Sequence, residues 1–498
     1  MGSTRSASNP GNQPTRAVAL VGPAGTGKTS LAEALLYASG EITRQGKVEA
    51  GNTVGDASPE ARARGGSTEL NLMHFNYLGD RFFLIDTPGA AGFATDGLAA
   101  IPAADMALVV IDPAPERAAL AEPILRRLDE LGMPHAIFIN KIETARAGAV
   151  RDTVAELQQM SQEPLALRQI PIREGDAVTG YVDLALERAY RYRPGAESER
   201  VEIPGEVLER EREERTHLLE TLADFDDTLL EALLMDEAPD QAMVMADLAD
   251  DTAGNKVVPV LLGSAQSDGG IHRLLKFLRH EAPSPDHAAE RLGLFEGGGL
   301  HVFKVTNAGA MGRLALGRVL GAPLAEGSEL LIEGEPARTG SIFFVQGEKT
   351  AKQGHAAAGD VVAVAKIDGA RGGMILGGAN ARIAGEAGLI MPVRNAAIAI
   401  QTRDRKDDVK LSTALHRLCD EDAGLEWTQD EASHETILRG INEEHLQIVL
   451  TRLERAAMAS RSTHGRHGSP IGNRSAKALR NAAATRSSRA DTANMATA

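Results

Sequence analysis

Hydrophobic and polar positions alternate with two different periods along the first 150 residues. Short apolar runs predict strands at Arg16–Val21, Leu70–Leu78, Phe82–Ile85, Met106–Ile111 and His135–Ile139. Between them, apolar residues at helical spacing predict helices at Thr29–Tyr37, roughly Gly92–Ala103, Glu116–Leu131 and Ala147–Met160. Short apolar strands separated by helices are typical of a parallel sheet covered on both faces. The pattern therefore predicts a first domain of α/β class, which we place at residues 16–285.

The pattern changes between about residues 160 and 250. A short strand-rich piece, Arg168–Leu184, precedes a highly charged helix at Glu206–Met235. The charges of that helix are typical of a solvated face held by pairs one turn apart. Because Lys256–Gly263 returns to an apolar strand pattern, we expect residues 160–250 to be an insertion in the sheet domain.

A third pattern begins after a linker that starts at Pro283 and runs to Gly299. Strand-like segments separated by Gly-containing turns predict a small β-barrel at residues 295–385, with strands at Leu300–Thr306, Ala315–Gly321, Ser328–Ile332, Gly340–Val345 and Asp360–Lys366. Residues 391–455 then follow the order strand, helix, strand, strand, helix, which is the start of a split β-α-β layer. We place this third domain at residues 390–455.

Composition adds limits to this picture. The net charge of −16 provides no general attraction for polyanions, and the single cysteine, Cys419, excludes a disulfide framework. No run approaches the roughly 18 apolar residues of a membrane span, so we expect no membrane association. Residues 1–15 are rich in Ser, Asn, Gly and Pro, and we expect a disordered lead rather than a signal peptide. Residues 461–498 hold six arginines and one lysine against one aspartate, so we expect 456–498 to be a disordered basic tail.

A phosphate-binding P-loop follows the first predicted strand. Small residues let backbone N–H groups close around phosphate oxygens, a lysine reaches the outer phosphates, and a hydroxyl can ligate Mg²⁺. The loop and the start of the next helix supply all of these parts: Gly22, Pro23, Ala24, Gly25, Thr26, Gly27, Lys28 and Thr29. The sequence therefore predicts binding of a nucleoside triphosphate with Mg²⁺.

Three further loops follow predicted strands, where ligand loops of such sheets lie. Asp86-Thr87-Pro88-Gly89 stands where a P-loop enzyme places the Asp that supports Mg²⁺ and the Gly that senses the γ-phosphate. Asn140-Lys141-Ile142-Glu143 corresponds to the Asn-Lys-x-Asp sequence with which GTPases bind guanine. Gly263-Ser264-Ala265 ends the strand after the insertion, where a backbone N–H commonly contacts the guanine oxygen. Together the four loops predict a guanine-nucleotide site.

From about residue 15 to 455 the chain resembles elongation factor G, the translocation GTPase of bacterial ribosomes. The resemblance also rests on the insertion, on Gly312-Arg313-Leu314 and Ala358-Gly359-Asp360 in the barrel, and on the segment Gly440–Leu446. It implies a P-loop GTPase domain with an inserted α+β subdomain, a β-barrel and a truncated ferredoxin-like domain. It also implies GTP or GDP with Mg²⁺ as cofactors, the ribosome as partner, a cytoplasmic location and a monomer.

The resemblance also assigns roles to residues. It implies that Thr29 and Ser67 ligate Mg²⁺ while Asp86 supports the water around it. It implies that guanine is held by the Asn140–Glu143 loop together with Ser264 and Ala265.

Three departures from the family sequence change the functional expectation. Ala90 replaces the histidine that follows Asp-Thr-Pro-Gly, so no polar side chain there can orient the attacking water. Glu143 replaces the guanine-binding Asp and adds a methylene. The first switch reads Arg64-Gly65-Gly66-Ser67-Thr68 instead of Arg-Gly-Ile-Thr, although Ser67 keeps a hydroxyl for Mg²⁺. We therefore expect an elongation factor G-like GTPase acting in translocation or ribosome recycling. The alternatives are a GTP-dependent binding module without hydrolysis and, less favoured, an ATPase.

The family continues after residue 455 with two more domains to which nothing here corresponds. The segment 494–497, Asn-Met-Ala-Thr, is what the bases for the family sequence Gln-Tyr-Gly-Asp could encode when read one base out of frame. We therefore expect residues after about Arg455 to be a frameshifted tail, with an RNA-binding arm as the alternative. A third domain without its last strand would present an open sheet edge.

Overall fold

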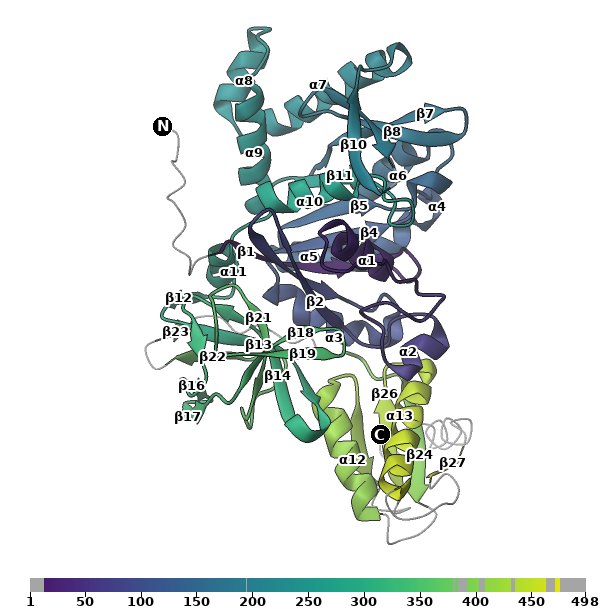
Figure 1. Ribbon diagram of the computed structural model, residues 1–498, viewed down its shortest axis with the longest axis vertical. Helices are drawn as coiled ribbons and strands as arrows, with labels where there is room; N and C mark the ends of the chain where they lie inside the picture. Colours follow the sequence, from purple (N-terminus) through teal and green to yellow (C-terminus); the bar gives the residue numbers. More distant parts are fainter. Residues whose placement is uncertain are drawn as a thin grey trace, which may run out of the picture.

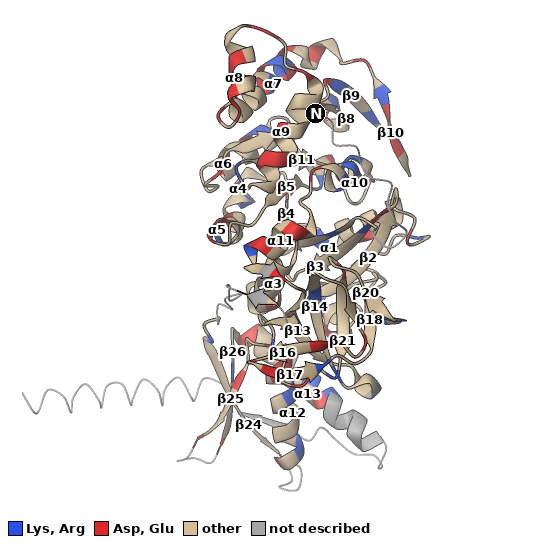
Figure 2. Cartoon of the chain, turned by 90° about the vertical axis from the view of Figure 1, so that its left-hand side faces the viewer, with Lys and Arg blue, Asp and Glu red and all other residues tan. Residues whose placement is uncertain are grey.

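The computed structural model describes residues 13–193, 195–378, 381–383, 392–402, 408–430, 435–462 and 471–474. The chain forms an elongated body, in which the insertion lies at one end, the first domain in the middle, and the barrel and third domain at the other end (Figure 1). On the side shown in Figure 2, acidic and basic residues are interspersed over the first domain and the barrel. Within the described ranges, no helix is both long and apolar enough to cross a membrane.

A seven-stranded sheet forms the centre of the first domain, in the order β2-β3-β1-β4-β5-β11-β6. Its strands are β1 (Thr15–Val21), β2 (Asn71–Tyr77), β3 (Asp80–Asp86), β4 (Met106–Ile111), β5 (His135–Ile139), β6 (Leu165–Leu167) and β11 (Val258–Leu262). The predicted parallel sheet is found, except that β2 runs antiparallel to β3. The reason is the tight turn at Leu78 and Gly79, both with positive φ, which leaves no room for a crossover helix.

Helices cover both faces of this sheet. They are α1 (Lys28–Ala38), α2 (Pro59–Arg64), α3 (Ala94–Ala100), α4 (Pro115–Ala118), α5 (Glu122–Glu130), α6 (Ala149–Gln158) and α10 (Ile271–His280). Leu31 of α1 and Leu274 of α10 pack in the core of one face, and Leu125 of α5 and Val150 of α6 pack in the core of the other. The single helix predicted over Glu116–Leu131 is broken, because Pro123 stands in the first turn of α5 and lacks the N–H that would continue the preceding helix.

The insertion consists of an antiparallel four-stranded sheet and three helices. The strands are β7 (Gln169–Glu174), β8 (Ala177–Asp183), β9 (Arg188–Arg193) and β10 (Ala196–Val201), and the helices are α7 (Leu208–Ala223), α8 (Asp227–Leu234) and α9 (Gln241–Ala253). The predicted helix Glu206–Met235 is in fact two helices. Asp226 divides them, because its carboxylate accepts the N–H groups of Thr228 and Leu229 and so starts a new helix.

The β-rich domain follows a short helix, α11 (Pro285–Arg291), in the segment predicted as a linker. Eight strands form one antiparallel sheet in the order β17-β16-β22-β13-β14-β21-β18-β19 around a separate core. The strands of this domain are β12 (Leu294–Glu296), β13 (Gly299–Asn307), β14 (Arg313–Leu320), β15 (Leu324–Ala325), β16 (Glu329–Ile332), β17 (Glu335–Arg338), β18 (Ile342–Gln346), β19 (Lys349–Gln353), β20 (His355–Ala356), β21 (Val361–Ala365), β22 (Ile375–Gly378) and β23 (Arg382–Ile383). A fully buried ion pair of 2.8 Å between Arg318 of β14 and Asp105 fixes this domain to the first.

The third domain has the ferredoxin-like order of elements. These are β24 (Ala396–Thr402), α12 (Asp408–Glu421), β25 (Glu426–Gln429), β26 (Thr436–Gly440), α13 (Glu443–Ser462) and β27 (Ile471–Arg474). The open sheet edge expected from truncation at residue 455 is wrong, because α13 continues to Ser462 and β27 pairs with β24. The sheet order β25-β26-β24-β27 therefore includes a fourth strand. The rest of the predicted tail, the segment 494–497 and most of the predicted lead lie outside the described residues.

Candidate functional site

The P-loop lies between β1 and α1, with its glycines in backbone conformations that other residues rarely adopt. Gly22, Gly25 and Gly27 have φ values of 141°, 79° and 92°. A Cβ on Gly22 would lie 2.2 Å from the carbonyl oxygen of Val110 in the neighbouring strand. The loop therefore requires glycine at Gly22 for steric as well as conformational reasons.

Lys28 is drawn inward by this loop. Its Nζ donates hydrogen bonds of 2.8 and 2.9 Å to the carbonyl oxygens of Gly22 and Pro23. Burial lowers the pKa of Lys28 to about 8, although the nearby carboxylates of Asp86 and Asp56 oppose this shift by favouring the charged form. A buried ammonium group beside a ring of backbone amides is an environment suited to a polyanion such as a triphosphate.

Two carboxylates and two hydroxyls meet at the start of α1. Thr29 Oγ1 lies 2.7 Å from Asp86 Oδ2, 3.3 Å from Asp56 Oδ2 and 3.3 Å from Ser67 Oγ. Ser67 Oγ in turn donates to Asp56 Oδ2 at 2.9 Å. The predicted magnesium residues Thr29, Ser67 and Asp86 are thus brought together, and Asp56 joins them.

The charge of Lys28 only partly offsets the two carboxylates of this cluster. Asp86 is fully buried, and its Oδ1 has no hydrogen-bond partner among the described residues. Burial, with the nearby charge of Asp56, raises the pKa of Asp86 to about 7. Oxygen ligands that are short of a counter-charge suit Mg²⁺, which retains waters and phosphate oxygens in its shell. No group of three or more His, Cys, Asp or Glu side chains in the described part of the chain is placed to hold a metal alone.

The segment after β3 packs tightly on the P-loop. Thr87 Oγ1 donates to the carbonyl oxygen of Leu20 at 2.8 Å. A Cβ on Gly89 would lie 2.7 Å from the carbonyl oxygen of Gly22 and 2.8 Å from the backbone nitrogen of Ala24, so only glycine allows this approach. Pro88 and Ala90 flank Gly89, and Ala90 is half-buried with only a methyl group to offer. The predicted loop is therefore in place beside the phosphate site, without a polar side chain at its end.

The predicted base-binding loops meet on the other side of the P-loop. Buried Asn140 donates through Nδ2 to the carbonyl oxygen of Thr26 at 2.9 Å and accepts the N–H of Ala265 at 2.9 Å. Its amide therefore connects the P-loop to the loop after β11. Fully buried Ser264 stabilises that second loop, because its Oγ accepts the N–H of Ser267 at 3.0 Å.

Lys141 and Glu143 complete this side of the site. Lys141, at a positive φ of 57°, donates through Nζ to the carbonyl oxygen of Gly25 and lies 3.2 Å from Asp112 Oδ1. The next residue, Ile142, is buried, whereas Glu143 is exposed in the following 3-10 turn. The carboxylate of Glu143 is therefore available at the position where the sequence predicts a guanine contact.

Sequence reasoning missed Asp56 and Glu33. Asp56 has a strained φ of 40° and holds Ser67 and Asn71 with hydrogen bonds of 2.9 Å each. Glu33 is buried on α1 and accepts the N–H groups of Gly46 and Val54, at 2.8 and 2.5 Å, so it fixes the loop that leads to Asp56. Helical spacing places Glu33 away from the face formed by Leu31 and Leu35, so the sequence pattern gave no signal that Glu33 is buried. No pattern marked Asp56, because it follows no strand.

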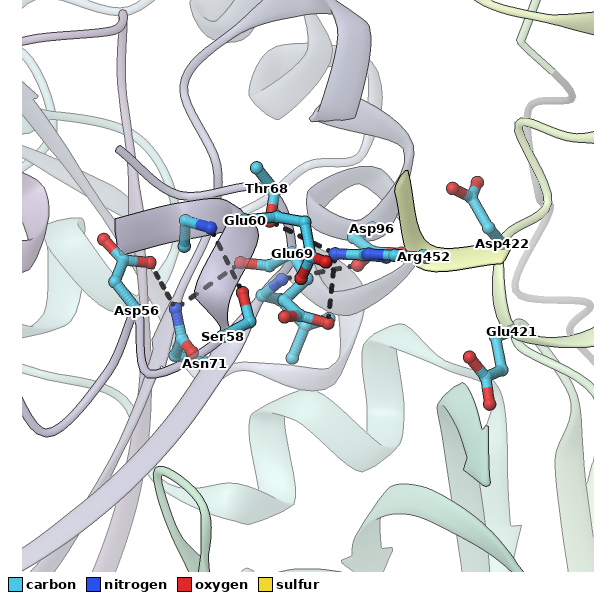
Figure 3. Close-up of polar contacts among 12 residues, drawn as sticks. Asp56, Ser58, Glu60, Thr68, Glu69, Asn71, Asp96, Glu421, Asp422 and Arg452 are labelled. Atoms are coloured by element: carbon cyan, nitrogen blue, oxygen red, sulfur yellow. Dashed lines mark hydrogen bonds and ion pairs between the residues drawn. The ribbon is translucent and has the colours of Figure 1, made fainter. Parts of the chain in front are cut away.

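The third domain contacts the segment that carries Ser67. Arg452 of α13 donates to Thr68 Oγ1 at 3.1 Å and lies 3.5 Å from Glu69, as Figure 3 shows. Arg455 lies 3.0 Å from Glu60, which precedes this segment on α2. Burial raises the pKa of Glu69, but the charges of Arg452, Lys304 and Arg455 and a hydrogen bond from Ser58 together outweigh burial and lower it overall. The conformation around Ser67 is thus connected electrostatically to α13.

Comparisons with known proteins agree with this architecture. The family described as "Elongation factor Tu GTP binding domain" matches residues 13–284, and the family "Elongation Factor G, domain III" matches residues 391–463. An elongation factor G-like protein of Synechocystis sp. is 38% identical over 450 residues, covering 90% of this chain and 66% of its own length. Elongation factor G 2 of Streptomyces coelicolor is 31% identical and covers 86% of this chain and 64% of its own length. The chain therefore spans about two thirds of the length of these curated relatives.

A solved structure gives the same result for the fold. A crystal structure of a Thermus thermophilus protein matches with a TM-score of 0.82 and 29% identity, covering 93% of this chain and 67% of that one. The first family match alone extends over more than half of the chain. The predicted fold class is thereby confirmed, and the chain belongs to the elongation factor G-like family of translational GTPases.

Proposed function

We propose that this chain binds GTP and GDP with Mg²⁺ at the carboxyl end of its central sheet. The single observation that carries the proposal is the cluster of Lys28, Thr29 and Asp86 at the P-loop, where a buried cation adjoins carboxylates whose charge it only partly offsets. The P-loop amides and Lys28 would hold the phosphates. Thr29, Ser67 and Asp86 would hold Mg²⁺, which neutralises phosphate charge when bound.

The base is proposed to be guanine. Asn140 orders both neighbouring loops through its two hydrogen bonds, one of which it accepts from the Ala265 N–H, and the exposed Glu143 carboxylate is available to the base edge. The added methylene of Glu143 moves its carboxylate outward compared with Asp. We therefore expect guanine preference to persist in weaker form and to increase in Glu143→Asp.

Nucleotide binding is tested with a fluorescent GDP analogue and the full chain. Wild type is expected to bind in the presence of Mg²⁺, and Lys28→Ala is expected to lose at least about tenfold in affinity, because charge-assisted phosphate contacts are strong. Lys256→Ala is the matched control, since Lys256 pairs with Asp251 in the same domain at the end of α9, away from the P-loop. Equal loss in both variants, or no binding by wild type, would refute the proposal.

We further propose that the chain acts in the cytoplasm as a monomer that docks on the factor-binding site of the ribosome, in translocation or recycling. Its family and the named relatives support this role. Purified 70S ribosomes are expected to raise phosphate release from GTP above background. If the chain binds GTP but ribosomes do not raise its rate of GTP hydrolysis, a role in ribosome-stimulated turnover is contradicted.

Ala90 favours a second candidate, a nucleotide-dependent binding module without hydrolysis. Its methyl group cannot orient an attacking water, and positioning of water contributes strongly to GTP hydrolysis. In this case GTP would bind with no ribosome-stimulated turnover, and Ala90→His would restore turnover. An inert Ala90→His variant that still binds GTP would show that Ala90 is not the cause.

A further inference from the structure

An arginine of the short helix after β4 lies against the P-loop. Arg117 of α4 donates through Nη2 to the carbonyl oxygen of Ala24 at 3.3 Å. The same nitrogen would lie 3.9 Å from a Cβ built on Gly25, and it is the nearest heavy atom there. The guanidinium group therefore lies on the outer half of the phosphate loop, and 42% of the Arg117 side chain is exposed.

The local sequence explains this position. β4 ends at Ile111 beside β1, and only Asp112, Pro113 and Ala114 separate it from α4. Pro115 fits the first position of α4, where no N–H is needed. The short connection brings the first turn of α4 to the carboxyl end of the sheet, next to the P-loop.

Asp112 orients two cations around the loop. Its carboxylate, which is almost fully buried, pairs with Arg117 on one side and with Lys141, at 3.2 Å, on the other. Lys141 donates to Gly25 and Arg117 to Ala24, so adjacent P-loop carbonyls each hold one cation. Lys141 belongs to the predicted base-binding loop, whereas Arg117 belongs neither to that loop nor to the cluster around Thr29.

We propose that Arg117 is an arginine finger supplied by the chain itself for GTP hydrolysis. The proposal rests on the proposed GTP binding. The guanidinium would exchange its bond to Ala24 for phosphate oxygens by rotation about its own side-chain bonds. Asp112 would act as the positioning residue that holds it near the loop. A guanidinium fork donates two parallel hydrogen bonds to phosphate and stays protonated throughout.

The reaction that Arg117 would assist is direct hydrolysis. A water oxygen bonds to the γ-phosphorus, the bond from that phosphorus to the β–γ bridging oxygen breaks, and its electron pair stays on GDP. The water contributes its protons to phosphate and solvent. Negative charge grows on the bridging oxygen as this bond breaks, and Arg117 would stabilise it there. Such stabilisation does not require a polar side chain at position 90. The chain would therefore retain GTP hydrolysis although Ala90 stands there.

A purely structural role for Arg117 makes a different prediction. If Arg117 only braces the P-loop through Ala24, its removal weakens GDP and GTP binding equally and leaves the rate of bound GTP hydrolysis unchanged. If it is a finger, its removal lowers the rate of the bound complex and changes the two affinities little.

The test measures single-turnover hydrolysis of GTP, with and without 70S ribosomes, and dissociation constants for GDP and GTP, all in the full chain. Arg117→Ala is expected to lower the single-turnover rate by about 10³-fold or more, within the range known for arginine fingers, with both affinities within about threefold of wild type. Arg117→Lys is expected to recover only part of the rate, because an ammonium group lacks the planar fork. Arg151→Ala is the control, since Arg151 is an exposed arginine that pairs with its neighbour Asp152 on α6.

A second measurement applies if wild-type turnover is too slow to follow. Wild type with GDP is expected to bind aluminium fluoride, which mimics the phosphoryl group in flight, and Arg117→Ala is expected to lose this complex while still binding GDP. The finger is overturned by an unchanged rate or an intact aluminium fluoride complex in Arg117→Ala. It is also overturned if wild type binds GDP but forms no aluminium fluoride complex. In that case the proposal of guanine-nucleotide binding still stands. Absence of any guanine-nucleotide binding overturns both.

Discussion

Asp86→Asn is expected to stabilise the nucleotide-free protein while weakening the nucleotide-bound one. Asp86 is fully buried, its Oδ1 has no described partner, and Asp56 lies across the Thr29 hydroxyl from it. Burial and this like charge raise the pKa of Asp86 from 3.8 to about 7. Ionising the side chain in the folded state therefore costs about 4 kcal/mol above pH 7, at 1.36 kcal/mol for each pKa unit.

The sign of the pH dependence follows from this shift. Between about pH 4 and 7 the folded state binds the proton of Asp86 more tightly than the unfolded chain, so stability falls as pH rises through this window. Asparagine does not ionise and can still accept the Thr29 hydrogen bond. In EDTA without nucleotide, we expect Asp86→Asn to raise the free energy of unfolding by about 4 kcal/mol at pH 7.5 and by about 2 kcal/mol at pH 5. Saturating Mg²⁺ and GDP should remove or reverse this gain.

Scanning calorimetry of the full chain measures this effect. The unfolding transition to follow is the one whose midpoint temperature changes when Mg²⁺ and GDP are added. Asp105→Asn is the matched control, because Asp105 is equally buried but is already paired with Arg318 at 2.8 Å. Breaking that pair is expected to cost about 3–5 kcal/mol under all conditions. A loss of nucleotide-free stability in Asp86→Asn, or a gain that does not grow from pH 5 to 7.5, would refute the reasoning.

Three other substitutions test separate parts of the structure. Gly22→Ala should abolish nucleotide binding, measured by titration with fluorescent GDP, because its Cβ would lie 2.2 Å from the carbonyl oxygen of Val110; retained affinity would contradict the P-loop geometry. Burial, with the charges of two arginines, lowers the pKa of His301 to about 3. Because only the unfolded chain takes up this proton below pH 6.5, the free energy of unfolding should fall by about 1.4 kcal/mol for each pH unit between about 6.5 and 3. His301→Leu should flatten that decline in urea titrations at pH 5 and 6, and an unchanged slope would contradict it. Arg452→Gln should weaken Mg²⁺-dependent GTP binding by about fivefold or more through the released Ser67 segment, since coupling between sites is typically about 1–3 kcal/mol. Unchanged affinity would show that α13 and the site are uncoupled.

The sequence predicts those parts of the site that are continuous in the chain or follow strands. Gly22–Thr29 is one uninterrupted motif, and Asp86 and Asn140 each end an apolar strand of a sheet whose ligand loops must lie at one edge. Asp56 could not be predicted in this way. It lies in a loop, at a positive φ, and reaches the site only because Glu33 holds the loop before it.

The fold shows the same limits. Apolar runs identified the central strands, but strand direction depends on the connection, and the tight turn at Gly79 makes β2 antiparallel. The composition of the tail predicted disorder from residue 456, whereas β27 gains its backbone hydrogen bonds from β24, about 70 residues away in the chain. Pairing over such a distance leaves no periodic signal in a short polar segment.

Competition between nucleotides tests the central claim most directly. Fluorescent GDP is bound to the full chain in Mg²⁺ and titrated with unlabelled GTP and with ATP, in parallel with Lys28→Ala. We expect GTP to displace the probe from wild type at concentrations at least about tenfold lower than ATP, and Lys28→Ala to hold the probe poorly. Displacement by ATP as readily as by GTP would contradict guanine recognition. Failure of wild type to bind the probe at all would contradict the nucleotide site itself.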